Sequence, residues 1–161
     1  MINSEQLREL IIKPTLRYLE PEITYSEAAV ELLMMTCAHE SRLGTYIAQV
    51  GGPALGIYQM EPATEDDIWT NFLEYKHELS NKIDALTCDL VYSPCQELSS
   101  NLVFATAMAR VHYYRDKEAL PDVEDIEGLA RYAKRVYNTK AGKADWRDYE
   151  TAYLAYWGYP F

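Results

Sequence analysis

One segment of the chain, from Ala28 to Ala38, most constrains the fold. It consists of Ala-Ala-Val-Glu-Leu-Leu-Met-Met-Thr-Cys-Ala, which is apolar around almost the whole circumference that a helix would have. A helix without a polar face has to be surrounded by protein. We therefore predict that this segment is the central, buried helix of the fold.

Helical signals continue along the rest of the chain. Capping residues and first-turn prolines predict helix starts at several places, namely Asn3 or Ser4, the Thr24–Glu27 capping box, Ser93–Pro94–Gln96, Pro121–Asp122 and the region of Asp145. Pro14 is expected to interrupt or kink the first helix because proline lacks a backbone donor. Pro62 is positioned to start a further helix.

Apolar residues at helical spacing support these predictions. From Pro94 onward they lie in steps of three and four on a single face, at Leu98, Leu102, Ala105, Ala109 and His112. The same spacing predicts helices over Val123–Val136 and about Asp145–Trp157, the last ending at Gly158. Because no long stretch alternates with period two, we predict an all-α or mainly α fold, with any strand confined to Leu43–Met60.

Composition narrows the classes of protein that fit. The 161 residues suit one domain, predicted to span 1–161, and they carry 15 Lys and Arg against 25 Asp and Glu, a net charge of −10. This balance disfavours nucleic acid as a partner, since nonspecific binding to phosphates needs clustered cations. No apolar run approaches the ~20 residues of a membrane span, and charges are spread through the first helix, so we expect neither a membrane span nor a signal peptide.

Histidine and cysteine residues show no pattern typical of a metal site. His39, His77 and His112 lack ligand spacing with cysteine or acids, and no glycine-rich phosphate loop or nucleophile elbow is present. We therefore expect neither a metal nor another cofactor. The cysteines are odd in number and lack a Cys-x-x-Cys motif, which indicates reduced thiols; they are Cys37, Cys88 and Cys95.

Glu40 stands immediately after the apolar segment, where the buried helix ends. Apolar walls and the negative end of the helix dipole both disfavour a carboxylate there, so we expect the Glu40 side chain to hold its proton. Arg42 would oppose this if it folded back. A protonated carboxyl is what a general acid needs in order to protonate a glycosidic oxygen. The alternative is a glutamate at a helix end that points into water.

The loop after Glu40 carries the residues through which the chain resembles a known family. Glu40-Ser41 and Leu43 are followed by Pro53-Ala54-Leu55-Gly56-Ile57-Tyr58-Gln59-Met60-Glu61-Pro62-Ala63-Thr64. This pattern resembles the lysozyme-like superfamily, specifically soluble lytic transglycosylases (the SLT domain) and goose-type lysozymes. Tyr137-Asn138, with Ala141-Gly142 slightly later, resembles a second motif of those families, so the resemblance covers roughly residues 25 to 157.

The resemblance implies a lysozyme-like fold with a central buried helix and a cleft loop, and it implies cleavage of peptidoglycan. Glu40 would protonate the oxygen of the β-1,4 bond between N-acetylmuramic acid and N-acetylglucosamine. Gln59, Tyr137 and Asn138 would position the sugar and the acid. In those families the tyrosine hydroxyl reaches the glutamate carboxyl, which implies the same contact between Tyr137 and Glu40.

Further residues of the two motifs receive binding roles. The resemblance implies that Ser41 helps to hold the loop beside the substrate. Tyr58, with Tyr46, falls in the cleft loop, where an amphipathic ring can stack on a sugar. Two alternatives stay open, because Gln59 also fits an amide that braces the loop and Tyr137 also fits a core tyrosine at the end of a helix.

The reaction type depends on a second carboxylate, because a hydrolase needs a base or a nucleophile across the bond. Glu61, Glu65, Asp66 and Asp67 are within reach by sequence, but the run from Glu65 also fits the solvated first turn of a helix. Without such a partner, the substrate's own groups complete the reaction, as in lytic transglycosylases, and leave a 1,6-anhydro product. A muramidase and a lytic transglycosylase both fit the sequence.

The expected partner is the glycan strand of peptidoglycan. A wall-directed enzyme without an export signal is typical of a phage, which makes it in the host cytoplasm. The phage then releases it through a lysis pore as an endolysin, or carries it in the virion with tail proteins. A toxin delivered by a dedicated machine would look the same. The rival hypothesis is a catalytically inactive lysozyme-like module, a virion structural or glycan-binding part that lost activity through Val50, Pro53 and Tyr58.

Overall fold

A computed structural model of the protein describes residues 1–88, 94–138 and 144–156. In this part of the chain the regular structure is helical, and two isolated β-bridges pair Leu55 with Ala48 and Met60. The prediction of a mainly α fold, with extended pairing confined to Leu43–Met60, is confirmed. The elements are α1 (Ser4–Gln6), the π-helix η1 (Leu7–Ile12), α2 (Lys13–Tyr18), α3 (Glu27–Ser41), α4 (Pro62–Asn71), the 3-10 helix η2 (Leu73–Tyr75), α5 (His77–Asp84), α6 (Pro94–Ser100), α7 (Leu102–Tyr114), α8 (Ile126–Val136) and α9 (Trp146–Tyr156).

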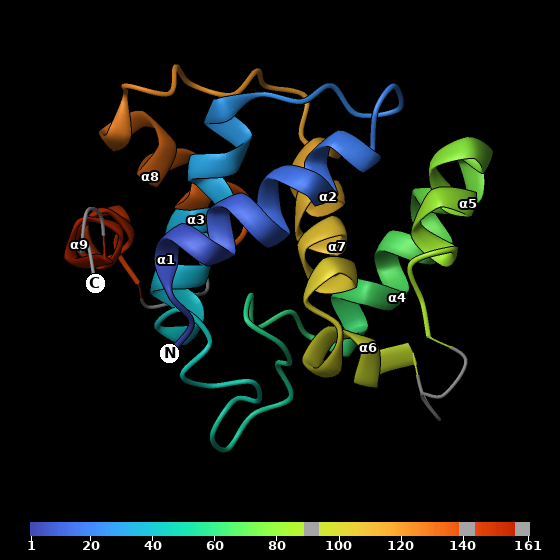
Figure 1. Ribbon diagram of the computed structural model, residues 1–161, viewed down its shortest axis with the longest axis horizontal. Helices are drawn as coiled ribbons and strands as arrows, with labels where there is room; N and C mark the ends of the chain where they lie inside the picture. The colour runs from blue at the N-terminus through green and yellow to red at the C-terminus, as the bar shows by residue number, and fades with distance from the viewer. Residues whose placement is uncertain (89–93, 139–143, 157–161) are drawn as a thin grey trace.

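Helix α3 lies at the centre, as its sequence predicts. Consecutive residues from Leu32 to Ala38 are all buried, which leaves this stretch without a solvent-facing side. The elements η1, α7, α8 and α9 pack against the helix. Figure 1 shows α8 and α9 on one side of α3, α7 on the other, and the first helical segments crossing in front. Each fully buried Leu or Met contributes about 1.5–3 kcal/mol, so this helix organises the main core.

The start of α3 differs from the predicted capping box. Ser26, with an extended backbone, is the N-cap, and its hydroxyl accepts a hydrogen bond from the Ala29 amide at 3.2 Å. Thr24 lies two residues earlier and is exposed, so the expected Thr24–Glu27 box is wrong. Thr24 and Ser26 both carry a hydroxyl group that can cap a helix. The extended conformation of Ser26 places its hydroxyl oxygen beside the first free amides of α3.

The first helical segments follow the prediction that Pro14 disturbs them. The Asn3 side chain caps α1, and Pro14 stands in the first turn of α2, directly after the π-helix η1. Because Pro14 lacks an amide hydrogen, the α-helical pattern cannot run unbroken through it. The wider turn of the π-helix shifts the buried face, so Leu7 and Ile12 are buried while Leu10 is 66% exposed.

The helix predicted from Pro94 through His112 is two helices. Asn101 separates α6 from α7, with φ −123° and ψ 98°, and its side chain accepts from the Phe104 amide at 3.0 Å. Asparagine side chains often bond to backbone amides in this way and so end or begin a helix. The apolar residues keep their helical spacing across Asn101, so spacing alone did not predict the break. Helix α8 likewise begins at Ile126, capped by Asp125, rather than near Pro121. The expected Ser93 cap and the stop at Gly158 lie outside the described residues.

Helix α7 joins two hydrophobic cores. Ala105, Ala109 and Tyr113 pack into the core around α3, while Phe104 and Met108 pack into a second core beneath α4 and α5. Figure 1 shows α4 and α5 on the side of α7 away from α3. The two groups of helices are therefore held together through the faces of one shared helix.

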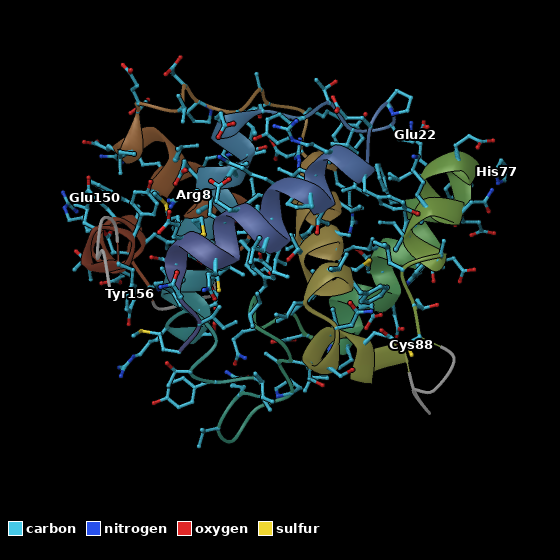
Figure 2. All side chains as sticks on the ribbon, in the orientation of Figure 1. Arg8, Glu22, His77, Cys88, Glu150 and Tyr156 are labelled. Atoms are coloured by element: carbon cyan, nitrogen blue, oxygen red, sulfur yellow. The ribbon has the colours of Figure 1, made fainter. Side chains whose placement is uncertain are left out.

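A partly buried ion pair ties the first segments to the centre of the fold. Arg8, labelled in Figure 2, donates from Nε and Nη2 to the two carboxylate oxygens of Glu31 on α3, at 3.0 and 2.9 Å. Tyr153 of α9 donates to the same carboxylate at 2.6 Å. Glu31 thus links η1, α3 and α9, and its charge is balanced where only 12% of the side chain is exposed.

The cap of α3 generates a test of this local structure. We expect Ser26→Ala to lower the free energy of unfolding by about 1 kcal/mol, because the Ala29 amide loses its acceptor. Thr24→Ala is the matched control and is expected to leave stability unchanged within about 0.5 kcal/mol. Urea denaturation of both variants measures the difference. Equal losses of stability in the two variants would support a cap at Thr24 and contradict the assignment of the cap to Ser26.

Candidate active site

A hollow of about 640 Å³ opens at the carboxyl end of α3. We call it the Glu40 hollow. Its wall brings together residues that are far apart in the sequence, and Glu40, Gln59, Tyr137 and Asn138 of the predicted site are among them. The remaining lining residues are Gln49, Ala54, Met60, Glu61, Thr64 and His112. The two sequence motifs, one before α7 in the chain and one after it, therefore line the same cavity.

The Glu40 carboxyl is held by one of its two oxygens. The hydroxyl of Tyr149, from α9, donates to Oε1 at 2.6 Å, and Nδ1 of His39 lies 3.2 Å from the same atom. Oε2 accepts no hydrogen bond from the described residues, and the side chain is 17% exposed. The surroundings are thus more polar than the expected apolar walls. The arrangement leaves Oε2 available to a ligand in the hollow.

Tyr149 contacts Glu40, a position that sequence reasoning missed. Its ring is fully buried and stacks on His39 with centroids 3.8 Å apart. Burial, and then the negative charge of Glu40, raise the pKa of the Tyr149 hydroxyl, so this group stays protonated and acts as a donor. In the sequence, Tyr149 and Tyr153 lie four residues apart in the same predicted helix, so both are expected on one face. No sequence signal separates the tyrosine that reaches Glu40 from the one that reaches Glu31.

Tyr137 does not make the contact that the resemblance implies. Its hydroxyl donates to the backbone carbonyl of Tyr58 at 2.9 Å rather than to Glu40. Burial, and then the Glu40 charge, raise the pKa of this hydroxyl as well. Tyr137 therefore lines the hollow and anchors the cleft loop to the end of α8. This contact fits the alternative of a structural tyrosine at the end of a helix.

Ser41 and Tyr58 support the site from within the protein. The Ser41 hydroxyl donates to the Ile57 carbonyl at 2.6 Å and accepts from the Gly44 amide at 2.8 Å. These contacts fit its expected role in holding the loop. Ser41 and Tyr58 are 0% and 1% exposed, so neither side chain is accessible to a ligand in the hollow. The prediction that Tyr58 stacks on a sugar is wrong, because its hydroxyl pairs with Thr106 inside the core.

The cleft loop, residues 42–61, begins and ends in left-handed backbone. Arg42 and Leu43 have φ of 53° and 51°, and Gln59 has φ of 48°. The carbonyl of Leu43 accepts from the amide of Ile2 at 2.7 Å, which fixes the start of the loop to the first residues of the chain. Arg42 is exposed, its guanidinium lies 6.0 Å from the Tyr46 ring centroid, and it forms no ion pair with Glu40 in the described part of the chain.

Gln59 and Asn138 each combine a place in the wall with a structural contact. The Gln59 amide donates from Nε2 to the Gly56 carbonyl at 2.7 Å, so it braces the loop as the alternative reading expected. Oδ1 of Asn138 accepts from Lys134 Nζ at 2.9 Å. Both side chains still line the Glu40 hollow, where amide groups can bond to hydroxyl or acetamido groups of a ligand.

The four acids proposed as a second carboxylate differ in their burial and in their position relative to the Glu40 hollow. Glu61 is exposed and lines the Glu40 hollow, whereas Asp66 is exposed and is not among its lining residues. Asp67 pairs with Arg115 at 2.6 Å in an adjoining hollow. Glu65 is 0% exposed, so the expectation that it lies in a solvated first turn is wrong for this residue. Of the four, Glu61 is therefore the acid that shares the hollow with Glu40.

The described residues form neither a metal site nor a membrane-spanning helix. No three His, Cys, Asp or Glu side chains there come together as a metal site. No helix in the same ranges is long and apolar enough to cross a bilayer. The expected pair Ala141-Gly142 lies outside the described residues.

Comparison of the chain with protein-family models, with curated proteins and with solved structures found no match.

The cleft loop generates a test of how tightly the site is fixed. Gly51 and Gly56 both have φ of +75°, but a Cβ on Gly51 would meet open space while one on Gly56 would overlap the carbonyl oxygen of Leu98. Gly51→Ala is expected to cost about 1–2 kcal/mol for its backbone alone. Gly56→Ala should cost at least about 1 kcal/mol more, because the loop must move away from α6. Chemical denaturation checks the difference, and equal costs would show that α6 does not hold the loop.

Proposed function

We propose that the chain is a peptidoglycan-cleaving glycosidase, either a muramidase or a lytic transglycosylase, with Glu40 as its general acid. The observation that carries this proposal is the asymmetry of the Glu40 carboxyl in the wall of the hollow. Tyr149 and His39 contact Oε1, whereas Oε2 accepts no hydrogen bond from the described residues. The resemblance of Glu40-Ser41, the cleft loop and Tyr137-Asn138 to lysozyme-like enzymes supports the same chemistry. A lysozyme-like fold is part of the proposal.

In the proposed reaction, Glu40 donates its proton through Oε2 to the oxygen of the β-1,4 bond. The bond from C1 of N-acetylmuramic acid to that oxygen then breaks, and positive charge develops on the sugar ring. The leaving N-acetylglucosamine keeps the oxygen and the proton as a hydroxyl group. The amides of Gln49, Gln59 and Asn138 line the wall, where they supply donors and acceptors for the sugar.

Two completions of the reaction fit the hollow. In a hydrolase, Glu61 accepts a proton from water as the water adds to C1, because Glu61 lines the same hollow. In a lytic transglycosylase, the 6-hydroxyl of the muramic acid adds to C1 instead and gives its proton to Glu40, which closes a 1,6-anhydro ring. The two products differ by one water molecule, so mass spectrometry separates them.

The central test is the removal of the acid. Wild-type protein is expected to release soluble fragments from purified peptidoglycan, and Glu40→Gln is expected to lower the rate by a factor of about 100 or more. Glu74→Gln, an exposed acid on η2, is the control and should retain full activity. Mass spectrometry of the fragments assigns anhydro or reducing ends. Full activity in Glu40→Gln would refute the proposal, and no fragments from wild-type protein would favour the non-catalytic module.

Tyr149 gives a second test, with a matched control on the same helix. Tyr149→Phe removes the donor to Glu40, and Tyr153→Phe removes the equivalent hydroxyl that donates to Glu31 at the same distance of 2.6 Å. Both variants should lose similar thermal stability. Only Tyr149→Phe should lower kcat, by about 10- to 100-fold with KM little changed, because a hydrogen bond to a charged group contributes about 1.5–3 kcal/mol. Equal kcat values in the two variants would show that Tyr149 only packs.

A further inference from the structure

His39 lies in the last turn of α3, directly before Glu40, and the proposed reaction gives it no chemical role. Nδ1 of its imidazole lies 3.2 Å from Oε1 of Glu40, the oxygen that also accepts from the Tyr149 hydroxyl at 2.6 Å. The same imidazole stacks on the Tyr149 ring, with centroids 3.8 Å apart and an angle of 16° between the planes. The side chains of His39, Glu40 and Tyr149 therefore contact one another in a closed triangle.

The surrounding helices hold this triangle in place. Tyr149 is 0% exposed, and its helix α9 packs against both α3 and α8. The side chains of His39 and Glu40 are each 17% exposed, so protein encloses most of both. A side chain whose rotamer is locked by packing can hold a functional group in one orientation. The triangle thus meets the geometric requirement for positioning a carboxyl group.

The contact between His39 and Glu40 needs a hydrogen atom between Nδ1 and Oε1. The Tyr149 hydroxyl already donates to Oε1, and it keeps its proton because burial, and then the Glu40 charge, raise the pKa of Tyr149. An ionised carboxylate only accepts hydrogen bonds, and a protonated carboxyl accepts chiefly through the oxygen that carries no proton. Oε1 is therefore the accepting oxygen in both protonation states of Glu40, and the hydrogen belongs to Nδ1.

This assignment gives His39 a tautomer that differs from that of another buried histidine. The nitrogen of an imidazole that carries the hydrogen is set by the hydrogen bonds of the ring. When His39 is neutral, a hydrogen on Nδ1 leaves Nε2 without one. In His112, by contrast, Nε2 lies 3.3 Å from the Val136 carbonyl, which can only accept, so that ring carries its hydrogen on Nε2. The two imidazoles are therefore distinguishable by spectroscopy.

We infer that His39 is a positioning residue for the general acid, which makes Oε1 an acceptor and so places the acid proton of Glu40 on Oε2. This inference rests on the proposed function, because it takes Glu40 to be the acid. A proton on Oε1 would weaken the hydrogen bonds from Tyr149 and His39, whereas Oε2 accepts none from the described residues. The same two donors stabilise the carboxylate that forms once the proton has left.

Two substitutions separate the donor of His39 from its ring. His39→Phe keeps an aromatic ring for the stack on Tyr149 but has no donor. His39→Asn loses the ring but keeps an amide nitrogen at the same number of bonds from the backbone as Nδ1. A role in packing alone would make the Asn variant the more damaged one, whereas a role through the hydrogen bond would make the Phe variant the less active one.

We expect His39→Phe to lower kcat on soluble peptidoglycan strands by about 10- to 100-fold with KM little changed, because the carboxylate loses one of its two donors. His39→Asn should recover most of this loss. The melting temperatures should follow the opposite order, because the Asn variant alone loses the stack on Tyr149. His77→Asn, at an exposed position on α5 that Figure 2 labels, is the matched control and should change neither quantity. A lower kcat in His39→Asn than in His39→Phe would overturn the inference and show that His39 only packs.

A second measurement does not depend on cleavage. Nitrogen NMR spectroscopy of the intact protein, in buffer alkaline enough for neutral imidazoles, reports which nitrogen carries the hydrogen in each histidine. We expect the Nδ1–H form for His39 and the Nε2–H form for His112, and the signal that His39→Phe removes identifies His39. The Nε2–H form at His39 would overturn the inference even where Glu40→Gln abolishes cleavage. Full cleavage by Glu40→Gln would instead refute the proposed function, and with it the role of His39, whichever tautomer is found.

Discussion

The burial of α3 on all sides is the constraint on which the rest of the structure depends. Helices α7, α8 and α9 and the π-helix η1 must cover it, since exposed apolar surface on this helix would cost about 25 cal/mol per Å². Covering it brings the inner face of α9 against the last turn of α3. Tyr149 reaches Glu40 for that reason, so the packing that stabilises the core also orients the candidate acid.

The parts of the fold that were predictable follow from strong periodic patterns. The position of α3, the start of α4 at Pro62 and the disturbance at Pro14 each have one dominant local cause. The break at Asn101 and the cap at Ser26 depend on which of several competing polar side chains meets a free amide, which spacing alone does not decide. In the site, the two motifs indicated Glu40 and its neighbours in the hollow. The partners of individual hydroxyl groups depend on packing between helices.

The abundance of tyrosine, 14 residues in all, has a structural use beneath the site. Tyr58, Tyr113 and Tyr149 are among the largest fully buried side chains, and their hydroxyl groups pair with Thr106, Thr36 and Glu40. A tyrosine ring fills apolar volume while its hydroxyl satisfies a buried polar partner. The expectation that the Tyr58 ring faces the sugar is thus reversed, and all three of these tyrosines lie in the core.

The left-handed backbone at Arg42 and Leu43 links distant parts of the molecule. Each such residue costs about 1–2 kcal/mol, and the pair persists because the Leu43 side chain is buried and its carbonyl is held by the Ile2 amide. Terminal residues fray easily in most proteins, usually without effect elsewhere. In this protein, fraying of the first residues would release the bond to Leu43 and let the strained turn relax. Disorder at the amino-terminal end would then be transmitted directly to the loop beside Glu40.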